Sequence, residues 1–175
     1  MIISVEALKS MPQFDDFSEA ELKQKIIAVE KKIRAYTHNN FQNRAVRFNS
    51  AVFSGKIACD SLYIKADDNI QISESGVNDG VYCVKQNENG NLIVDADIYD
   101  CKHVLVTKVE YPEDVIEGAV SMLKYDTERR GKEGIQSETI SRHSVTYFDV
   151  SETNQAIGYP ISLVSFLKPY MKARF

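Results

Sequence analysis

Residues 81–94 read Val-Tyr-Cys-Val-Lys-Gln-Asn-Glu-Asn-Gly-Asn-Leu-Ile-Val, the strongest hairpin signal in the chain. The pair Asn89-Gly90 suits a two-residue turn in which both residues adopt positive φ angles. β-Branched, aromatic and other apolar residues fill the runs on either side, at 81–84 and 92–94. The stretch therefore predicts a β-hairpin.

Similar short runs continue outward from this hairpin in both directions. Turn residues punctuate them, notably Asp79-Gly80 and the polar stretch 67–69. Together they predict five strands, at 57–65, 70–72, 81–85, 91–94 and 102–109. Five short strands with close turns favour a small curled sheet or barrel-like module.

The segment before this module is helical in pattern. Ser18 and Glu21 have the spacing of a capping box, in which each residue bonds the backbone of the other. Apolar residues then recur every three or four positions, at Leu22, Ile26, Val29, Ile33 and Tyr36. This stripe predicts an amphipathic helix of about five turns whose apolar side faces a core.

The segment after the module returns to helix and then to strand. Pro112, followed by two acidic residues, suits the first turn of a helix. Gly118 inside this helix reflects either the close approach of another helix or accident. Residues 135–149 alternate apolar and polar positions and predict a polar β-hairpin. Tyr159-Pro160 is expected to start a last helix, with Pro169 near its end.

These elements define an expected fold class and division of the chain. The class is α+β, with a mainly helical body of about three to four helices, an inserted small β-sheet or barrel-like module and a β-hairpin. Residues 1–50 and 110–175 are expected to form the helical body, which includes the hairpin at 135–149. Residues 51–109 are expected to form the inserted β module.

Composition narrows the classes of function. The chain has 175 residues, a formal net charge of −4 and no block of Lys and Arg, so a groove that grips nucleic acid is not expected. Neither a membrane-spanning apolar run nor a signal peptide is expected. The three cysteines are odd in number and lack CxxC spacing, which favours buried thiols in a reducing cytosol over disulfides or a metal site.

Motifs for catalysis are also missing from the sequence. There is no nucleophile elbow and no phosphate-binding glycine loop. Cys101 and His103 share one side of a strand, but a small thiol and a partly exposed imidazole explain them. The acidic stretches 67–69 and 95–97 lack the ligand spacing of a calcium loop, and no pair of carboxylates is singled out for acid–base chemistry. We therefore expect no enzyme activity and no catalytic, cofactor-binding or metal-binding residues.

Three segments together resemble the head–tail connector proteins of tailed phages and prophages, also called adaptor or head-completion proteins. The first ends in Ala-Tyr-Thr-His-Asn-Asn-Phe at 35–41. The second is Asp-Asn-Ile-Gln-Ile-Ser at 68–73 followed by Asn-Asp-Gly-Val-Tyr-Cys-Val at 78–84. The third joins Ile-Gln-Ser-Glu-Thr-Ile at 135–140, Ser-Val-Thr-Tyr at 144–147 and the pair Tyr159-Pro160. A glycine-containing turn commonly precedes the third segment's strand in the family, and Ser141-Arg142-His143 stands there in this chain.

The resemblance implies a virion structural protein of the neck, made in the bacterial host cytoplasm, without catalytic residues or cofactors. It implies a homo-oligomeric ring of about twelve copies, a closed cyclic assembly. Its partners would be the portal protein and a stopper or tail-completion protein, and DNA would pass through without specific binding. No membrane contact is implied.

Two surfaces are candidates for contact with the portal or with other subunits. A polar hairpin buries little apolar area alone, and the last helix has more apolar side chains than one face can hide. The candidate interface residues are Ile140, Arg142, His143, Val145, Tyr147, Phe166, Leu167, Tyr170 and Phe175.

A second interpretation is a small ligand-binding module. The β insertion would form its cup, and Tyr63, Tyr82 and Tyr99 would line it. Ordinary packing of tyrosines on strands explains the same residues.

Overall fold

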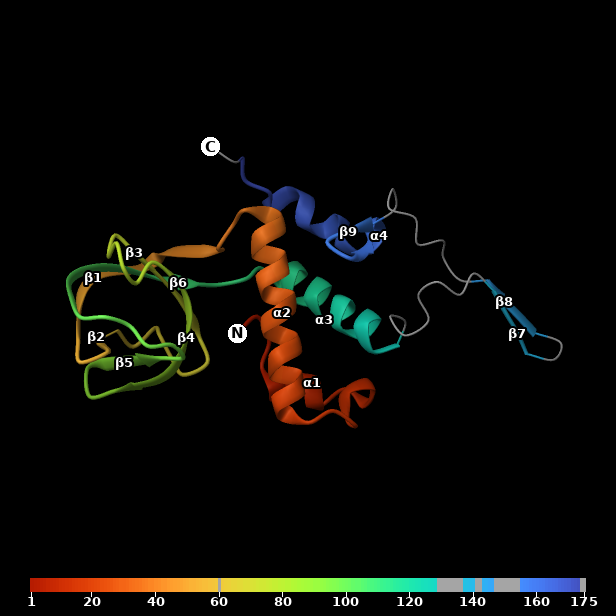
Figure 1. Cartoon of the computed structure of the whole chain (residues 1–175), viewed down its shortest axis with the longest axis horizontal. Helices are drawn as coiled ribbons and strands as arrows, with labels where there is room; N and C mark the ends of the chain where they lie inside the picture. Colours follow the sequence, from red (N-terminus) through yellow and green to blue (C-terminus); the bar gives the residue numbers. More distant parts are fainter. Residues whose placement is uncertain (60, 129–136, 141–142, 147–154, 174–175) are drawn as a thin grey trace. The chain divides into compact units, whose positions relative to one another are not determined.

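The chain divides into two compact units (Figure 1). The computed structural model describes residues 1–59, 61–128, 137–140, 143–146 and 155–173. We call 1–4 with 39–111 the barrel unit, and 5–38 with 112–175 the helical unit. In sequence, the barrel is therefore interposed between two segments of the helical unit.

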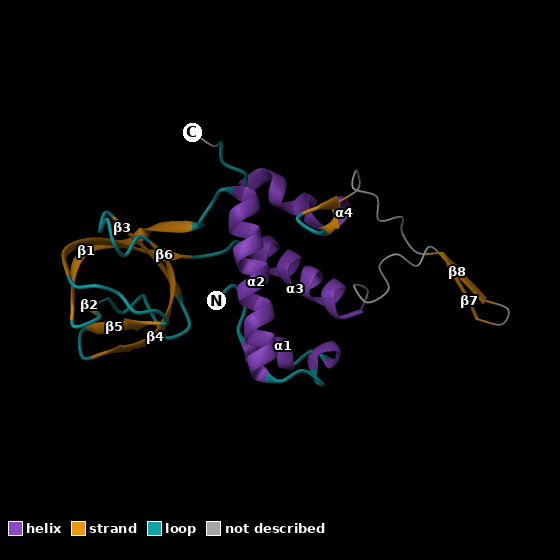
Figure 2. Cartoon of the chain, in the orientation of Figure 1, coloured by secondary structure: helices purple, strands orange, loops and turns teal. Residues whose placement is uncertain are grey.

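Six antiparallel strands make up the barrel (Figure 2). They close in the order β1-β2-β5-β4-β3-β6, so that β1 meets both β2 and β6. The strands are β1 (Gln42–Phe53), β2 (Lys56–Ala58), β3 (Asn69–Ser73), β4 (Gly80–Glu88), β5 (Asn91–Val94) and β6 (Cys101–Val109).

The expected fold class is wrong, because the protein is mostly a β-barrel core and not a helical body with a small insert. The barrel is closed, and strands account for 32% of the chain. The error arises at β1, most of which was expected to belong to the helical body. Its pairing with β6, from Gln42↔Val109 to Val52↔Cys101, completes the closure.

A second correction concerns the predicted strand at 57–65. Only β2 (Lys56–Ala58) forms there, and a long connection follows it to β3. This connection is fixed by polar contacts instead of a ladder: Asn87 Nδ2 donates to the carbonyl oxygens of Ser61 and Ile64, at 3.1 and 2.7 Å. Backbone groups outside a sheet need such partners.

The hairpin predicted around Asn89-Gly90 is confirmed as β4 and β5. Glu88 pairs with Asn91, and the two turn residues have φ angles of 54° and 72°. Both angles lie in the left-handed region that a two-residue turn of this type requires. Ser54-Gly55 makes a similar turn between β1 and β2.

The barrel interior is a packed hydrophobic core. One side of each strand faces inward, and apolar side chains fill the space. The fully buried members are Val52, Ile57, Ile70, Ile72, Val84, Leu92, Val104 and Val106. Val46, Phe48 and Tyr82 pack against them while remaining partly exposed.

Helices dominate the second unit. They are α1 (Val5–Lys9), η1 (Pro12–Phe14), α2 (Glu19–Thr37), α3 (Glu113–Glu128), α4 (Ile161–Val164) and η4 (Ser165–Tyr170). A short pair, β9 (Gln155–Ala156) and β10 (Tyr159–Pro160), precedes α4. The expected last helix is therefore split, with Pro160 in a strand and Pro169 within the 3-10 helix η4.

The predicted capping box at the start of α2 is confirmed. Ser18 Oγ accepts from the Glu21 N–H at 3.3 Å, and the Ser18 N–H donates to Glu21 Oε2 at 2.9 Å. Hydrogen bonds from the Ser18 hydroxyl and backbone lower the pKa of Glu21 below its usual value. Four residues of the predicted stripe, Leu22, Ile26, Val29 and Ile33, are buried.

We expect Glu21→Gln to destabilise the helical unit at neutral pH and to lose this effect in acid. The folded pKa of Glu21 lies below the reference value of 4.5, so its carboxylate stabilises the fold above that pH. This stabilisation is lost as the pH falls through the folded pKa. Urea unfolding of both proteins over a pH series measures the difference, and a difference that grew toward acid would contradict the expectation.

Gly118 in α3 is required by close approach of an aromatic ring. A Cβ atom there would lie 2.2–2.5 Å from three ring atoms of Phe166, which comes from η4. The helix tolerates the propensity cost of glycine, about 1 kcal/mol, because the ring occupies the space. Of the two explanations open at the sequence level, close approach therefore holds, and the approaching element is η4.

We expect Gly118→Ala to destabilise the helical unit by about 2 kcal/mol. The clash of the new methyl group with the ring costs about 3 kcal/mol, and the higher helix propensity of alanine offsets about 1 kcal/mol of this cost. Urea unfolding measures this change. The control is the same substitution in a Phe166→Ala background, where the clash is gone and alanine should stabilise by about 1 kcal/mol. Equal effects in both backgrounds would show that the ring does not set the requirement.

Candidate assembly surfaces

Three connections share one end of the barrel. They are the turn 54–55, the loop 74–79 and the loop 95–100. The register places them together: Val52 pairs with Cys101 at the start of β6, and Ser73 pairs with Leu105. We call this set the loop end. The chain connects to the helical unit from the opposite end, where Gln42 pairs with Val109.

Large apolar side chains are exposed at the loop end, on two of the connections and at the last residue of β1. Phe53, Val77 and Tyr99 are 63%, 64% and 73% exposed. At the opposite end, the 59–68 connection exposes Leu62 and Tyr63 in the same way. Single exposed apolar residues are ordinary, but several on the connections of one small unit indicate a contact surface.

Asn78 links two of the connections at the loop end. Its Nδ2 donates to the Tyr99 carbonyl at 2.7 Å, and its Oδ1 accepts from the Tyr99 N–H at 2.8 Å. The side chain is only 2% exposed. Gly55 N–H donates to Asp100 Oδ1, which joins the third connection. Val77 and Tyr99 therefore stand on a braced scaffold, which lowers the entropy cost of using them in binding.

We expect Asn78→Ala to destabilise the barrel unit by about 1 kcal/mol, because the backbone N–H and carbonyl of Tyr99 both lose their side-chain partner. Amide exchange at Tyr99 should become faster, which hydrogen exchange measures. Asn91→Ala is the matched control, since that amide bonds the Asn89 carbonyl on the surface, and its effect should stay below about 0.5 kcal/mol. Unchanged exchange at Tyr99 would show that Asn78 does not brace the loops.

The loop end is also acidic. Its exposed carboxylates are Glu74, Asp79, Asp95, Asp97 and Asp100. Asp79 accepts from the hydroxyl and backbone N–H of Ser75, at 2.6 and 2.9 Å, and these bonds lower its pKa. A surface with this charge repels nucleic acid phosphates and suits a protein partner.

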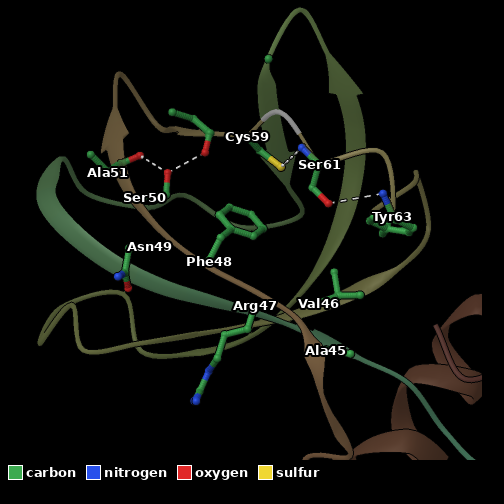
Figure 3. A pocket seen from close by; sticks show the side chains of 12 residues that line it. Ala45, Val46, Arg47, Phe48, Asn49, Ser50, Ala51, Cys59, Ser61 and Tyr63 are labelled. Atoms are coloured by element: carbon green, nitrogen blue, oxygen red, sulfur yellow. Dashed lines mark hydrogen bonds between the residues drawn. The ribbon is translucent and has the colours of Figure 1, made fainter.

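A hollow of about 570 Å³ lies beside β1 (Figure 3). The strand contributes residues 45–51, and the far wall comes from Ala58, Cys59, Ser61, Tyr63 and Gly90. Phe48 and Arg47 point to opposite sides of the strand in Figure 3, which fits the alternation of a β-strand. Ser50 Oγ donates to the Ala58 carbonyl at 2.6 Å and bridges the hollow at one side.

The proposed ligand cup of three tyrosines does not form around one space. Tyr63 lines the hollow beside β1. Tyr82 donates its hydroxyl to the Asn78 carbonyl at 3.0 Å, and burial, followed by the charges of Asp79 and Asp95, raises its pKa. Tyr99 is exposed at the loop end. The arrangement therefore gives no support to a tyrosine-lined ligand site.

The candidate interface residues of the last helix have internal contacts. Leu167 is fully buried, and the Phe166 ring lies over Gly118. Tyr170 donates its hydroxyl to both carboxylate oxygens of Asp114, at 2.8 and 2.9 Å, which raises the pKa of Tyr170. These residues stabilise the helical unit, and its exposed large apolar side chains in the described segments are Ile161 and Met171.

The other interface candidates lie in or near the predicted hairpin. Its backbone forms β7 (Ser137–Ile140) and β8 (His143–Thr146), with Ile140 opposite His143 and Glu138 opposite Val145. Arg142, Tyr147 and Phe175 lie outside the described residues. The exposed residues of the barrel connections were missed. The signal for them was an apolar residue inside a turn-rich segment, such as Val77 between Gly76 and Asn78.

Reactive groups do not gather in the described part of the chain. Among those residues, no group of three or more His, Cys, Asp or Glu could hold a metal ion. The Cys101 thiol accepts from Asn78 Nδ2 at 3.4 Å, and His103 faces Glu74 on the surface at 3.4 Å. No described helix is long and apolar enough to cross a membrane.

No protein-family model matches the chain, and no curated protein matches it significantly.

Proposed function

We propose that this chain is a structural subunit of a tailed-phage head–tail connector. In this role it forms a ring that joins the portal to the tail or stopper protein and extends the channel for DNA. The work is done by surfaces that bind other polypeptides, without a catalytic step, a cofactor or specific contacts to DNA.

The observation that carries the proposal is the exposure of large apolar side chains on braced connections of the barrel unit. Phe53, Val77 and Tyr99 stand at one end of the barrel, and Leu62 and Tyr63 stand at the other. Aromatic side chains on a preorganised backbone are the usual anchors of protein interfaces. A subunit in the middle of a stack needs contact surfaces in more than one direction, and two apolar ends meet that need.

The resemblance to connector proteins supplies the identity of the assembly. Its first segment ends α2 and leads into β1, and its second segment covers β3 and the start of β4. Its third segment includes β7, most of β8, and β10. The formal net charge of −4 is compatible with a passage along which DNA moves without sticking.

Assembly with the portal protein of the same phage tests the proposal. The purified chain, alone and mixed with portal, is studied by size-exclusion chromatography with light scattering and by electron microscopy of negatively stained particles. We expect rings, either alone or on the portal, with a central channel. A chain that stays monomeric and does not bind portal under either condition would refute the proposal.

A further inference from the structure

β1 has a free edge over residues 47–51, beyond a bulge in its pairing with β6 between Asn43 and Arg47. The strand spans Gln42–Phe53, but β2 pairs with it only at Val52 and Phe53. Its other neighbour, β6, occupies the opposite edge. Within the described residues, 47–51 therefore have no strand on the β2 side, and the hollow of about 570 Å³ lies along them. An unpaired edge of this kind readily accepts an added strand.

Charge restricts what suits this edge. β1 contains Arg44 and Arg47 and no acidic residue. Arg47 Nε donates to Thr107 Oγ1 across the β1–β6 ladder, at 3.1 Å. Neither arginine forms an ion pair with a carboxylate in the described part of the chain. A strand that brings an acidic side chain would therefore gain a favourable cross-strand pair.

The chain itself contains a strand of this description. β7 has the sequence Ser-Glu-Thr-Ile, and among described residues it pairs only with β8. An isolated two-stranded hairpin is marginally stable in water, so a third strand would stabilise it.

We propose that β7 of one copy adds to the free edge of β1 in the neighbouring copy. Each subunit then gives one strand and receives one, which is the head-to-tail contact that a ring requires. This inference rests on the proposed connector function and names the contact between its subunits.

Two single-cysteine chains test this contact. In a background without Cys59, Cys83 and Cys101, one chain carries Asn49→Cys on β1 and the other carries Thr139→Cys on β7. They are mixed under the assembly conditions above and treated with a short bis-maleimide. Cross-linking in this mixture requires two copies. The matched control replaces Asn49→Cys with Lys85→Cys, an exposed position on β4.

We expect a cross-linked dimer from the Asn49→Cys mixture and only background from the Lys85→Cys mixture. Rings that form without this difference would overturn the inference while leaving the connector function in place. A single chain with both cysteines that cross-links only within itself would also overturn it, because β7 would then occupy its own β1 edge. Absence of any oligomer or portal complex would refute the connector proposal as well.

A charge exchange gives an independent readout. Glu138→Arg or Arg47→Glu alone should weaken association by roughly two- to five-fold, the range for a cross-strand charge pair. The two changes combined should restore most of the loss, while thermal unfolding of each variant monomer monitors the fold. Additive losses in the double variant would show that the two side chains do not meet.

Discussion

Deletion of residues 136–148 is expected to abolish ring assembly while leaving a folded monomer. The deleted stretch contains β7 and β8, which pair with each other, and none of its described residues belongs to the ladder of the barrel. Light scattering should report loss of the oligomer, and circular dichroism should retain the signals of both units. Replacement of the same residues by a Gly/Ser segment of equal length should behave as the deletion does, because the contact requires the strands and not merely a chain of that length. An unaltered ring would refute the assignment of the hairpin.

Arg34→Met is expected to destabilise the helical unit by about 2 kcal/mol, because the buried Glu30 carboxylate loses a hydrogen bond from a charged group. Arg34 Nη1 lies 2.7 Å from Glu30 Oε1, one turn earlier on α2. The Glu30 side chain is only 4% exposed, so water cannot replace the guanidinium without local opening.

The double variant Glu30→Met/Arg34→Met is the control. Removing both charges leaves no buried carboxylate, and most of the lost stability should return. Urea unfolding of the single and double variants measures both changes. A neutral single variant, or a double variant less stable than the single one, would show that the pair does not act as argued.

Local signals in the sequence were reliable where short-range chemistry decides the structure. The capping box of Ser18 and Glu21 predicted the start of α2, and Asn89-Gly90 predicted the turn between β4 and β5. Pro112 likewise preceded the first turn of α3. In each case the required groups lie within four residues of each other, so the sequence contains the whole interaction.

The barrel could not be predicted in the same way, because its closure depends on pairing between distant residues. β1 pairs with β6 across 49 to 67 positions, and its apolar alternation at Val46, Phe48 and Val52 is interrupted by Ser50. A barrel needs every strand, so one missed strand changed the predicted class of the fold. The strand predicted at 57–65 was wrong for a different reason. Its apolar residues after Ala58 lie in a connection that pairs with no other strand.

The interface prediction depended on counting apolar residues without knowing their neighbours. The last helical region is rich in them, but Leu167 is buried and Phe166 fills the space over Gly118. The apolar residues that remain exposed lie on the barrel connections, where Tyr99 is held by Asn78. Which apolar side chain is left outside a core is decided by tertiary packing, and no local pattern contains that information.

The pairing of Gln42 with Val109 has a consequence for how this architecture is built. Opposed residues of an antiparallel pair lie only about 5 Å apart, so the chain enters and leaves the barrel at nearly the same place. A few glycines could bridge the two positions in a barrel-free version without stretching α2 or α3. Because these two positions lie so close together, the whole barrel can be inserted, deleted or exchanged as one segment without a change in the sequence of the helices.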